Sequence, residues 1–534
     1  MYIMCSNCYR KQTNRKVECM KRAKQRNKLK MGPVIVLIVL ALVGAYFGIN
    51  KLKDSGALDG LAKSAEQKDR VKKGVKTIRV GVCTWGGYAG GQYFNGGFAF
   101  DKKVSRFYKD YGLEVEFVLE DDPAKSLKAW ENDDLDLHWY TADAFPTIYA
   151  DLAKYDPKIV FQSDWSRGGD AIVATSKIKK VSDLKGATVA VALKTPSHSL
   201  LIKTLEANNM TLSDIKVVEC ATAIEASEKF QNKEVDAAVV WSPDDETCIA
   251  EVNGSKILTS TKDATNIIAD VFFAKGVWVE KNPEVLQKLI KGWMTGNAEL
   301  ATESNKDEAA KILAVGLNNT DEFCKRAINN VRLATYGDNL NFFGLNVEYK
   351  GITGEDIYKS MGRTYSKLGA APDNLPKWKD VVYRDGLRDL GLNGSADKAE
   401  PALVFATDTK SEKADMKKEE FASKNVTINF GSGASDLNDD SKVTIDDEVV
   451  NIIQTFGGVK VRIEGNTDNE GNPEGNKILS RKRAQAVASY LTQTYNIDPS
   501  KFVVVGNGPN NPVADNSTDS GKAQNRRTEI KFIK

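Results

Sequence analysis

A single apolar run near the N-terminus constrains the fold of this chain more than any other feature. The segment MGPVIVLIVLALVGAYFGI, residues 31–49, contains no acidic or basic side chain. Roughly 20 apolar residues in a helix span the hydrocarbon core of a bilayer. A buried helix of a soluble domain would normally keep a polar face, and this run has none. We therefore expect residues 31–49 to cross a membrane once.

The charge on either side of this run predicts its orientation. Residues 1–30 carry ten Lys or Arg side chains and one acid, Glu18. Positive flanking charge favours the cytoplasmic side, so everything after Asn50 would lie across the membrane, in the periplasm of a bacterium. The run is longer than a signal-peptide core and lacks a good small-x-small site, which favours an uncleaved anchor over a cleaved leader. Met20 is an alternative start.

The net charge of +3 hides an asymmetry between the two parts of the chain. If residues 1–30 contribute about +9, the remainder is near −6, which offers no basic footprint for nucleic acid. Of seven cysteines, Cys5 and Cys8 form a C-x-x-C pair without a nearby His or second pair, so free thiols are favoured over zinc. A periplasmic compartment would permit one disulfide among the later cysteines, and the sequence cannot pair them.

Composition and periodicity divide the rest of the chain. Residues 50–76 are charged and predict a tether. From Thr77, short Val/Ile/Ala-rich runs alternate with amphipathic stretches, which indicates an α/β fold with a parallel sheet covered on both faces. We expect a two-lobed domain over residues 77–395 (second lobe about 169–269), a linker over 396–424 and a small α+β domain over 425–534.

The last domain contains the segment GNTDNEGNPEGNKILSRKRA, residues 465–484. Arg483 occupies the same helical stripe as Leu479, Val487 and Leu491, and a guanidinium on a packed face needs an acceptor. Asn476 lies two turns earlier, near the free amides of the helix start. With Asp468 in the preceding loop, these groups suit a zwitterion. The alternative is that Asp468 and Arg483 pair with each other.

The order T-D-x-x-G, then Asn476, L-S-x-x-R-A and finally N-R-R resembles the OmpA-like peptidoglycan-binding domain over residues 425–534. The resemblance implies that Asp468 and Arg483 hold the zwitterionic end of diaminopimelate in the cell-wall peptide. Asn476, Thr467 and loop amides would support them, and residues 525–526 would brace the site. Asn466 stands where the family often has His, two residues before the ligand-binding Asp.

Residues 77–395 show no hydrolase, metalloprotease or P-loop motif. The glycine-rich loop WGGYAGGQYFNGG fits a nucleotide site poorly and predicts close backbone approach to a small ligand. VGVCTWGGY, DWSRGGDAIVAT and VDAAVVWSPDD resemble periplasmic substrate-binding proteins of the nitrate/sulfonate/taurine class. The resemblance implies two α/β lobes that close on a solute, with no cofactor, metal or covalent chemistry.

Ligands of α/β sheets bind beyond strand ends, which selects candidate solute-binding residues. They are Trp85, Thr141, Asp143, Gly168, Gly169, Thr195, Ser197, His198, Trp241 and Asp244. Each has an ordinary structural alternative: core packing for the Trp residues, a helix N-cap for Ser197 and a solvated first turn for His198. Helix amides near Ser197 favour an anion, whereas Trp85 and Asp143 would equally suit an amine. The resemblance favours an anion such as nitrate, a sulfonate or phosphate.

Together these features predict an inner-membrane-anchored, wall-attached periplasmic solute-binding protein that serves an ABC-type permease. A solute sensor is an open alternative. A stator-like linker is disfavoured, because residues 31–49 contain no ionisable carboxylate. An enzyme on the same scaffold is disfavoured, because no catalytic constellation is evident.

Overall fold

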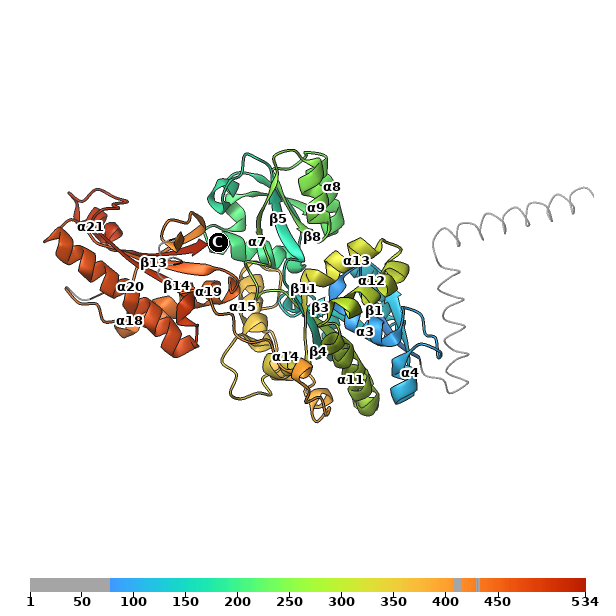
Figure 1. Ribbon diagram of the computed structural model, residues 1–534. Coiled ribbons are helices and arrows are strands. Elements are labelled where there is room, and N and C mark those ends of the chain that lie inside the picture. The colour runs from blue at the N-terminus through green and yellow to red at the C-terminus, as the bar shows by residue number, and fades with distance from the viewer. Residues whose placement is uncertain (1–76, 408–410, 412–413, 429, 431–432) are drawn as a thin grey trace, which may run out of the picture. The chain divides into compact units, whose positions relative to one another are not determined.

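The computed structural model describes residues 77–407, 411, 414–428, 430 and 433–534 (Figure 1). The predicted basic segment, membrane span and tether lie outside the described residues and stay predictions. Within the described part of the chain, no helix is both long and apolar enough to cross a bilayer. Three sheets organise this part of the chain, and each forms its own domain or lobe.

Lobe 1 is built on a six-stranded sheet in the order β11-β4-β10-β3-β1-β2. Its strands are β1 (Thr77–Val82), β2 (Glu114–Leu119), β3 (Leu137–Thr141), β4 (Pro157–Ser166), β10 (Ala269–Lys275) and β11 (Val331–Leu333). The first three strands run parallel, but β10 is antiparallel to β3 and β4. The sheet is therefore mixed rather than parallel, because the chain re-enters it from the second lobe between β3 and β4.

Helices cover the sheet of lobe 1, and most begin with a polar cap or a proline. They are α3 (Ala89–Asn95), α4 (Arg106–Tyr111), α5 (Pro123–Glu131), α6 (Phe145–Leu152), α10 (Gly276–Lys281), α11 (Pro283–Glu299), α12 (Glu303–Leu317), α13 (Asp321–Asn329), α14 (Tyr336–Phe342), α15 (Gly354–Lys367) and α16 (Trp378–Val381). For example, Thr353 caps α15 by accepting from the Asp356 amide, and Ile357, Met361 and Tyr365 form its buried face.

Lobe 2 has a five-stranded sheet in the order β7-β6-β8-β5-β9. Its elements are β5 (Asp170–Ala174), β6 (Thr188–Ala192), α7 (Pro196–Glu206), β7 (Lys216–Cys220), α8 (Ala223–Gln231), β8 (Ala237–Trp241), α9 (Asp244–Glu251) and β9 (Lys256–Ser260). The strands β5, β6 and β8 are Val- and Ala-rich and almost wholly buried, as expected for strands covered on both faces.

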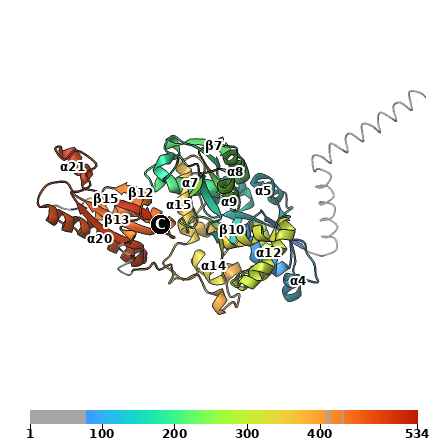
Figure 2. The same ribbon diagram turned by 45° about the horizontal axis from the view of Figure 1, so that its top comes forward.

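Two chain crossings join the lobes, one after β4 and one after β9. The Thr261 Oγ1 atom ties them together: it accepts from the Gly168 amide at 2.8 Å and shares a 2.8 Å hydrogen bond with Ser166 Oγ. Gly168 has φ +119, which only glycine adopts readily. A second contact joins α7 to α15, where Ser199 and Tyr365 share a hydrogen bond (Figures 1 and 2).

The terminal domain has a four-stranded sheet in the order β12-β15-β13-β14. Its elements are β12 (Glu420–Val426), α18 (Asp439–Ile445), α19 (Asn451–Thr455), β13 (Lys460–Asn466), α20 (Pro473–Tyr495), β14 (Phe502–Gly508), α21 (Asp519–Asn525) and β15 (Thr528–Ile533). The long α20 packs tightly on the sheet at Gly465 of β13. A Cβ at this position would lie 2.1 Å from the Ser480 carbonyl oxygen of α20.

The predicted linker over 396–424 differs from the structure at its end. β12 begins at Glu420, and the buried Asp415 carboxylate pairs with Lys460 Nζ at 2.6 Å. The charged residues that suggested a linker therefore supply ion pairs and an edge strand of the terminal domain. The sequence also did not predict β4, β9 or β11. Charged and polar residues interrupt the apolar pattern in each of these strands.

Candidate functional site

A small cavity lies between the two lobes, at the strand ends, and ten residues line it. Four are aromatic: Trp85, Tyr88, Trp139 and Trp241. Two are carboxylates: Asp170 and Asp270. The others are Cys83, Thr141, Pro196 and Ile268. Its volume is about 10 Å³, about the room that one water molecule needs. The lobes are therefore closed on each other, and a larger solute requires them to open.

Trp85 follows β1 and is anchored from lobe 1. Its indole Nε1 donates to Asp164 Oδ1 at 3.1 Å, and Ser163 Oγ donates to the other oxygen at 2.8 Å. Asp164 can approach this closely because Gly87 has no side chain: a Cβ there would lie 1.9 Å from Asp164 Oδ2. The ring of Trp85 is thereby held in place within the cavity wall.

The glycine-rich loop packs closely against other parts of the protein at several of its glycines. A Cβ on Gly86 would lie 2.2 Å from the Ala327 backbone of α13. Gly90 and Gly91 similarly allow α3 to pack on Asn297 and Trp293 of α11. The expectation of close backbone approach to a ligand is thus replaced by close approach between packed helices.

Tyr88 and Asp270 form a second buried pair in lobe 1. The Tyr88 hydroxyl donates to Asp270 Oδ1 at 2.8 Å, and both residues are shielded from solvent. Tyr88 also packs near Trp139, with ring centroids 6.4 Å apart. The cavity wall on this side is therefore an aromatic surface with a carboxylate held at its base.

Trp241 completes the aromatic lining from lobe 2. Its ring meets Trp139 at 82°, with centroids 6.5 Å apart. Its Nε1 donates to Ser197 Oγ at 3.0 Å. The helix start that was expected to receive an anion thus positions a tryptophan ring instead.

Asp170 opens β5 immediately after the crossing between lobes. Its Oδ2 accepts from Ser166 Oγ at 2.7 Å, whereas its Oδ1 is buried without a hydrogen-bond partner. Asp170 is 1% exposed. An unpaired buried carboxylate oxygen is costly unless a ligand or proton satisfies it.

Burial and mutual repulsion raise the pKa values of the acids at the cavity. Burial, followed by repulsion from neighbouring carboxylates, raises the pKa of Asp170 to about 8. Burial, followed by repulsion from Asp164, also raises the pKa of Asp270. Burial raises the pKa of Asp143 to about 6. Burial lowers the pKa of both His138 and His198 to about 4, so these imidazoles are neutral at pH 7.

The cavity brings together three of the ten residues predicted for the solute cleft: Trp85, Thr141 and Trp241. Three more support it from behind. Gly169 touches the Trp85 ring, Ser197 holds Trp241, and Asp143 is fully buried beyond β3.

The other four lie apart from the cavity lining. The Gly168 amide donates to Thr261 Oγ1 at the crossing between the lobes. Thr195 donates to the Ala192 carbonyl oxygen at 2.8 Å, and His198 Nδ1 accepts from the Lys194 amide at 3.2 Å. Asp244 is half-buried at the start of α9. No comparison tests these assignments, which stay predictions.

Sequence reasoning missed Tyr88, Trp139, Asp170 and Asp270 as lining residues. Asp170 and Asp270 carried a detectable signal, because each is an acid at the head of a buried strand. Asp170 is the first residue of DAIVA, and Asp270 is the second residue of ADVFFA. A charged group at the head of such a strand needs a partner or a function.

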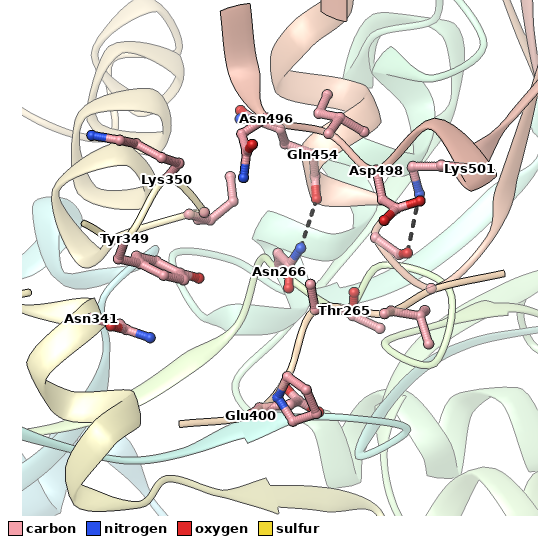
Figure 3. A pocket seen from close by; sticks show the side chains of 18 of the residues that line it. Thr265, Asn266, Asn341, Tyr349, Lys350, Glu400, Gln454, Asn496, Asp498 and Lys501 are labelled. Carbon is pink, nitrogen blue, oxygen red and sulfur yellow. Dashed lines mark hydrogen bonds between the residues drawn. The ribbon is translucent and has the colours of Figure 1, made fainter. Parts of the chain in front are cut away.

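A larger depression, about 1160 Å³ in volume, lies where loops of lobe 2 and lobe 1 meet the terminal domain (Figure 3). Asn266 Nδ2 donates to the Gln454 carbonyl oxygen at 3.0 Å across it. Several of its charged groups pair within the protein, as Arg332 does with Asp338 and Arg167 with Glu400. Arg167 Nη1 is buried without a hydrogen-bond partner, so this depression also holds an unsatisfied buried group.

In the terminal domain, Asp468 pairs with Arg526 Nη1 at 2.7 Å and also accepts from the Glu470 amide at 3.1 Å. Arg483 donates its Nε to the Ala434 carbonyl oxygen at 3.0 Å and lies over the Phe430 ring. Burial, followed by repulsion from Arg526, lowers the pKa of Arg483.

The two supporting residues of this loop make local contacts. Asn476 donates to the Glu470 carbonyl oxygen at 2.7 Å, and Thr467 donates to that of Asp468 at 2.8 Å. These contacts fold the 467–476 loop against the start of α20. The assignment of the four residues to a ligand stays a prediction.

Two family models match the chain. The one described as OmpA family matches residues 429–526, and the one described as NMT1/THI5 like matches residues 103–305. Among curated proteins, the chain is 44% identical over 82 residues to the probable lipoprotein YiaD of Escherichia coli K12 (15% of this chain, 37% of that protein). It is 31% identical over 192 residues to the peptidoglycan-binding protein ArfA of Mycobacterium tuberculosis (35% of this chain, 53% of that protein). The chain thus spans about a third to a half of these relatives.

Among solved structures, the chain resembles the periplasmic aliphatic sulphonate binding protein SsuA from Escherichia coli at 19% identity and a TM-score of 0.47. That match covers 58% of this chain and 99% of the other. It resembles the periplasmic nitrate-binding protein NrtA from Synechocystis PCC 6803 at 14% identity and a TM-score of 0.48, covering 61% and 91%.

The two family matches fall on the lobes and on the terminal domain, in the order that the sequence resemblances predicted. The chain therefore joins a two-lobed α/β domain that matches the NMT1/THI5-like family model to a C-terminal domain that matches the OmpA family model.

Proposed function

We propose that this chain is a periplasmic solute-binding protein that is held to the cell wall. The observation that carries the proposal is the cavity between the lobes, to which lobe 1 contributes Trp85 and Asp270 and lobe 2 contributes Asp170 and Trp241. A cavity that exists only when two lobes meet forms and opens with their closure, as solute capture requires. The role needs no catalytic chemistry and no cofactor.

The terminal domain would supply attachment to peptidoglycan. The OmpA-family match and the similarity to a protein named for peptidoglycan binding support this part of the proposal. Asp468 would accept the ammonium of a diaminopimelate end after exchange with Arg526, and Arg483 would receive the carboxylate. Asn476 and Thr467 would hold the loop in shape.

Delivery to an ABC-type permease, with anchoring by residues 31–49, is the finer form of this proposal. The predicted apolar run supports the anchor, and a solute sensor would use the same parts. The sequence resemblance favours an anion, but the ten residues that line the cavity include no Lys, Arg or His to bind one.

The wall-binding part can be tested by pull-down of the full chain on purified peptidoglycan of the diaminopimelate type. Asp468→Ala and Arg483→Ala should each abolish retention, whereas Lys482→Ala, on the exposed side of α20, should retain it. Free meso-diaminopimelate should compete, and cadaverine, which has the two ammonium groups but neither carboxylate, should not. Retention by both site variants would support a purely structural role for Asp468 and Arg483.

Solute capture can be tested by a thermal-shift screen with small cations, anions and neutral solutes. A solute present at one hundred times its Kd should stabilise the fold by about 2.7 kcal/mol. If no solute of any charge shifts the melting temperature, the capture role fails.

A further inference from the structure

The charge around the cavity is one-sided. Asp170 and Asp270 line it, and Asp143 and Asp164 are buried directly behind the lining. No basic side chain is among the lining residues. The Arg167 guanidinium, whose charge acts on Asp164 behind the lining, contacts Glu400 at 3.1 Å. An anion entering this cavity would meet carboxyl groups without any compensating positive charge.

The aromatic lining provides a complementary surface for a cation. Trp85 and Tyr88 come from the turn after β1, Trp139 from β3 and Trp241 from β8, and the four rings line one small space. An aromatic ring attracts a cation at its face, and a set of rings recognises quaternary ammonium groups in particular. The rings are held by hydrogen bonds: Trp85 by Asp164, Tyr88 by Asp270 and Trp241 by Ser197.

Asp170 independently points to a charged partner. Asp170 lines the cavity, and its Oδ1 is buried without a hydrogen-bond donor, although its Oδ2 is satisfied by Ser166. A cation between this oxygen and the rings would satisfy it without breaking an existing contact. Among the described residues, no group of three or more His, Cys, Asp or Glu side chains could hold a metal ion, which favours an organic cation.

We propose that the cleft between the lobes binds a small organic cation, an amine or a quaternary ammonium group, against Asp170 and the faces of the four aromatic rings. This inference rests on the proposed solute-binding function and specifies its ligand class. It replaces the anion that the sequence resemblance favoured. The lobes open to admit the cation, since the closed cavity holds about one water molecule.

Protonation of Asp170 predicts a pH dependence of solute binding. Burial holds the pKa of Asp170 near 8, so a cation must displace a proton to pair with it. The charged groups that act on Asp170 are the acids Asp143, Asp164, Asp245 and Asp270, and Cys83 and Tyr88 line the same cavity. Affinity for a cation of constant charge should therefore rise as the pH increases from 6 to 9, whereas affinity for an anion should fall.

The test measures binding to the purified full chain by calorimetry, with tetramethylammonium chloride, choline chloride, 3,3-dimethyl-1-butanol, sodium nitrate and sodium methanesulfonate as probes. The butanol is the uncharged counterpart of choline. A quaternary ammonium probe should bind, at least about tenfold more tightly than the butanol, and more tightly at pH 9 than at pH 6. Equal binding of choline and the butanol would overturn the inference.

Single substitutions distinguish the effect of the Asp170 charge on affinity from an effect on the folded structure. Asp170→Asn keeps the shape and should weaken the ammonium probe about tenfold or more, while raising the melting temperature of the free protein, because it removes a buried acid. Trp241→Leu should weaken binding and Trp241→Phe should restore part of it. Asp214→Asn, a surface change of equal charge in the same lobe, should leave affinity unchanged.

The outcomes distinguish this inference from the function on which it rests. Binding of nitrate or methanesulfonate without binding of either ammonium probe would overturn the cation and leave solute capture intact. Unchanged ammonium affinity in Asp170→Asn would also overturn it. If no probe binds in calorimetry and no solute of any charge shifts the melting temperature, both the cation inference and the solute-binding function are contradicted.

Discussion

Trp85 and Gly169 lie in direct contact across the crossing between the lobes: a Cβ on Gly169 would be 2.1 Å from Trp85 Cη2. The Trp85 ring cannot retreat without losing its hydrogen bond to Asp164. The backbone that connects the lobes is thus shaped around a side chain of the solute cavity, which links lobe position to cavity shape.

This contact predicts the effect of Gly169→Ala. The added methyl group should displace either the Trp85 ring or the crossing, at a cost of about 1–3 kcal/mol of stability. Solute affinity should fall with it, as measured by chemical unfolding and by calorimetry on the same sample. Gly475→Ala, where the nearest atoms would be 3.8 Å from the new Cβ, is the matched control. Equal stability of the two variants would contradict the contact.

Stability of the solute-free protein should depend on pH through Asp170. Its pKa is about 8 in the fold and about 3.9 in an unfolded chain. The folded state therefore holds the proton more tightly, and this contribution is complete below about pH 4 and is lost as pH rises toward 8. Urea unfolding between pH 5 and 9 should show a decline that is shallower in Asp170→Asn. Identical slopes would refute the assignment.

Lys501 should stabilise the terminal domain. Its buried Nζ donates to the carbonyl oxygens of Phe456 at 2.7 Å, Gly457 at 3.1 Å and Val459 at 2.7 Å, and Figure 3 shows where Lys501 lies. Lys501→Met would leave these acceptors without that donor and cost about 1–3 kcal/mol. Thermal unfolding measures the loss, and Lys442→Met, on an exposed helix face, should show little change.

The predicted anchor can be tested by topology. In a Gram-negative host, protease added after permeabilising only the outer membrane should digest residues 77–534, because the bulk of the chain would lie in the periplasm. Digestion that begins only after the inner membrane is broken would contradict the predicted orientation. A cytoplasmic marker protein in the same sample verifies that the inner membrane stayed intact.

The sequence alone determined the order of the parts and most buried strands. β1, β5, β6, β8 and β13 were all predicted, because apolar side chains in short runs indicate strands whatever surrounds them. The OmpA-family domain was likewise evident, because its motif residues are close together in the chain. β4 was missed, since its polar residues are buried by partners distant in sequence, and most of β12 was missed, since its charged and polar residues hide a strand with only two buried side chains.

Only the tertiary structure decided the character of the solute cavity. Trp85, Asp170 and Asp270 are far apart in the chain, and nothing local indicates that the crossings bring them to one place. The same holds for Asp468, whose partner Arg526 is 58 residues away. Local pattern reports whether a residue prefers burial, whereas the partner of a buried charge depends on which distant strand ends meet when the lobes close.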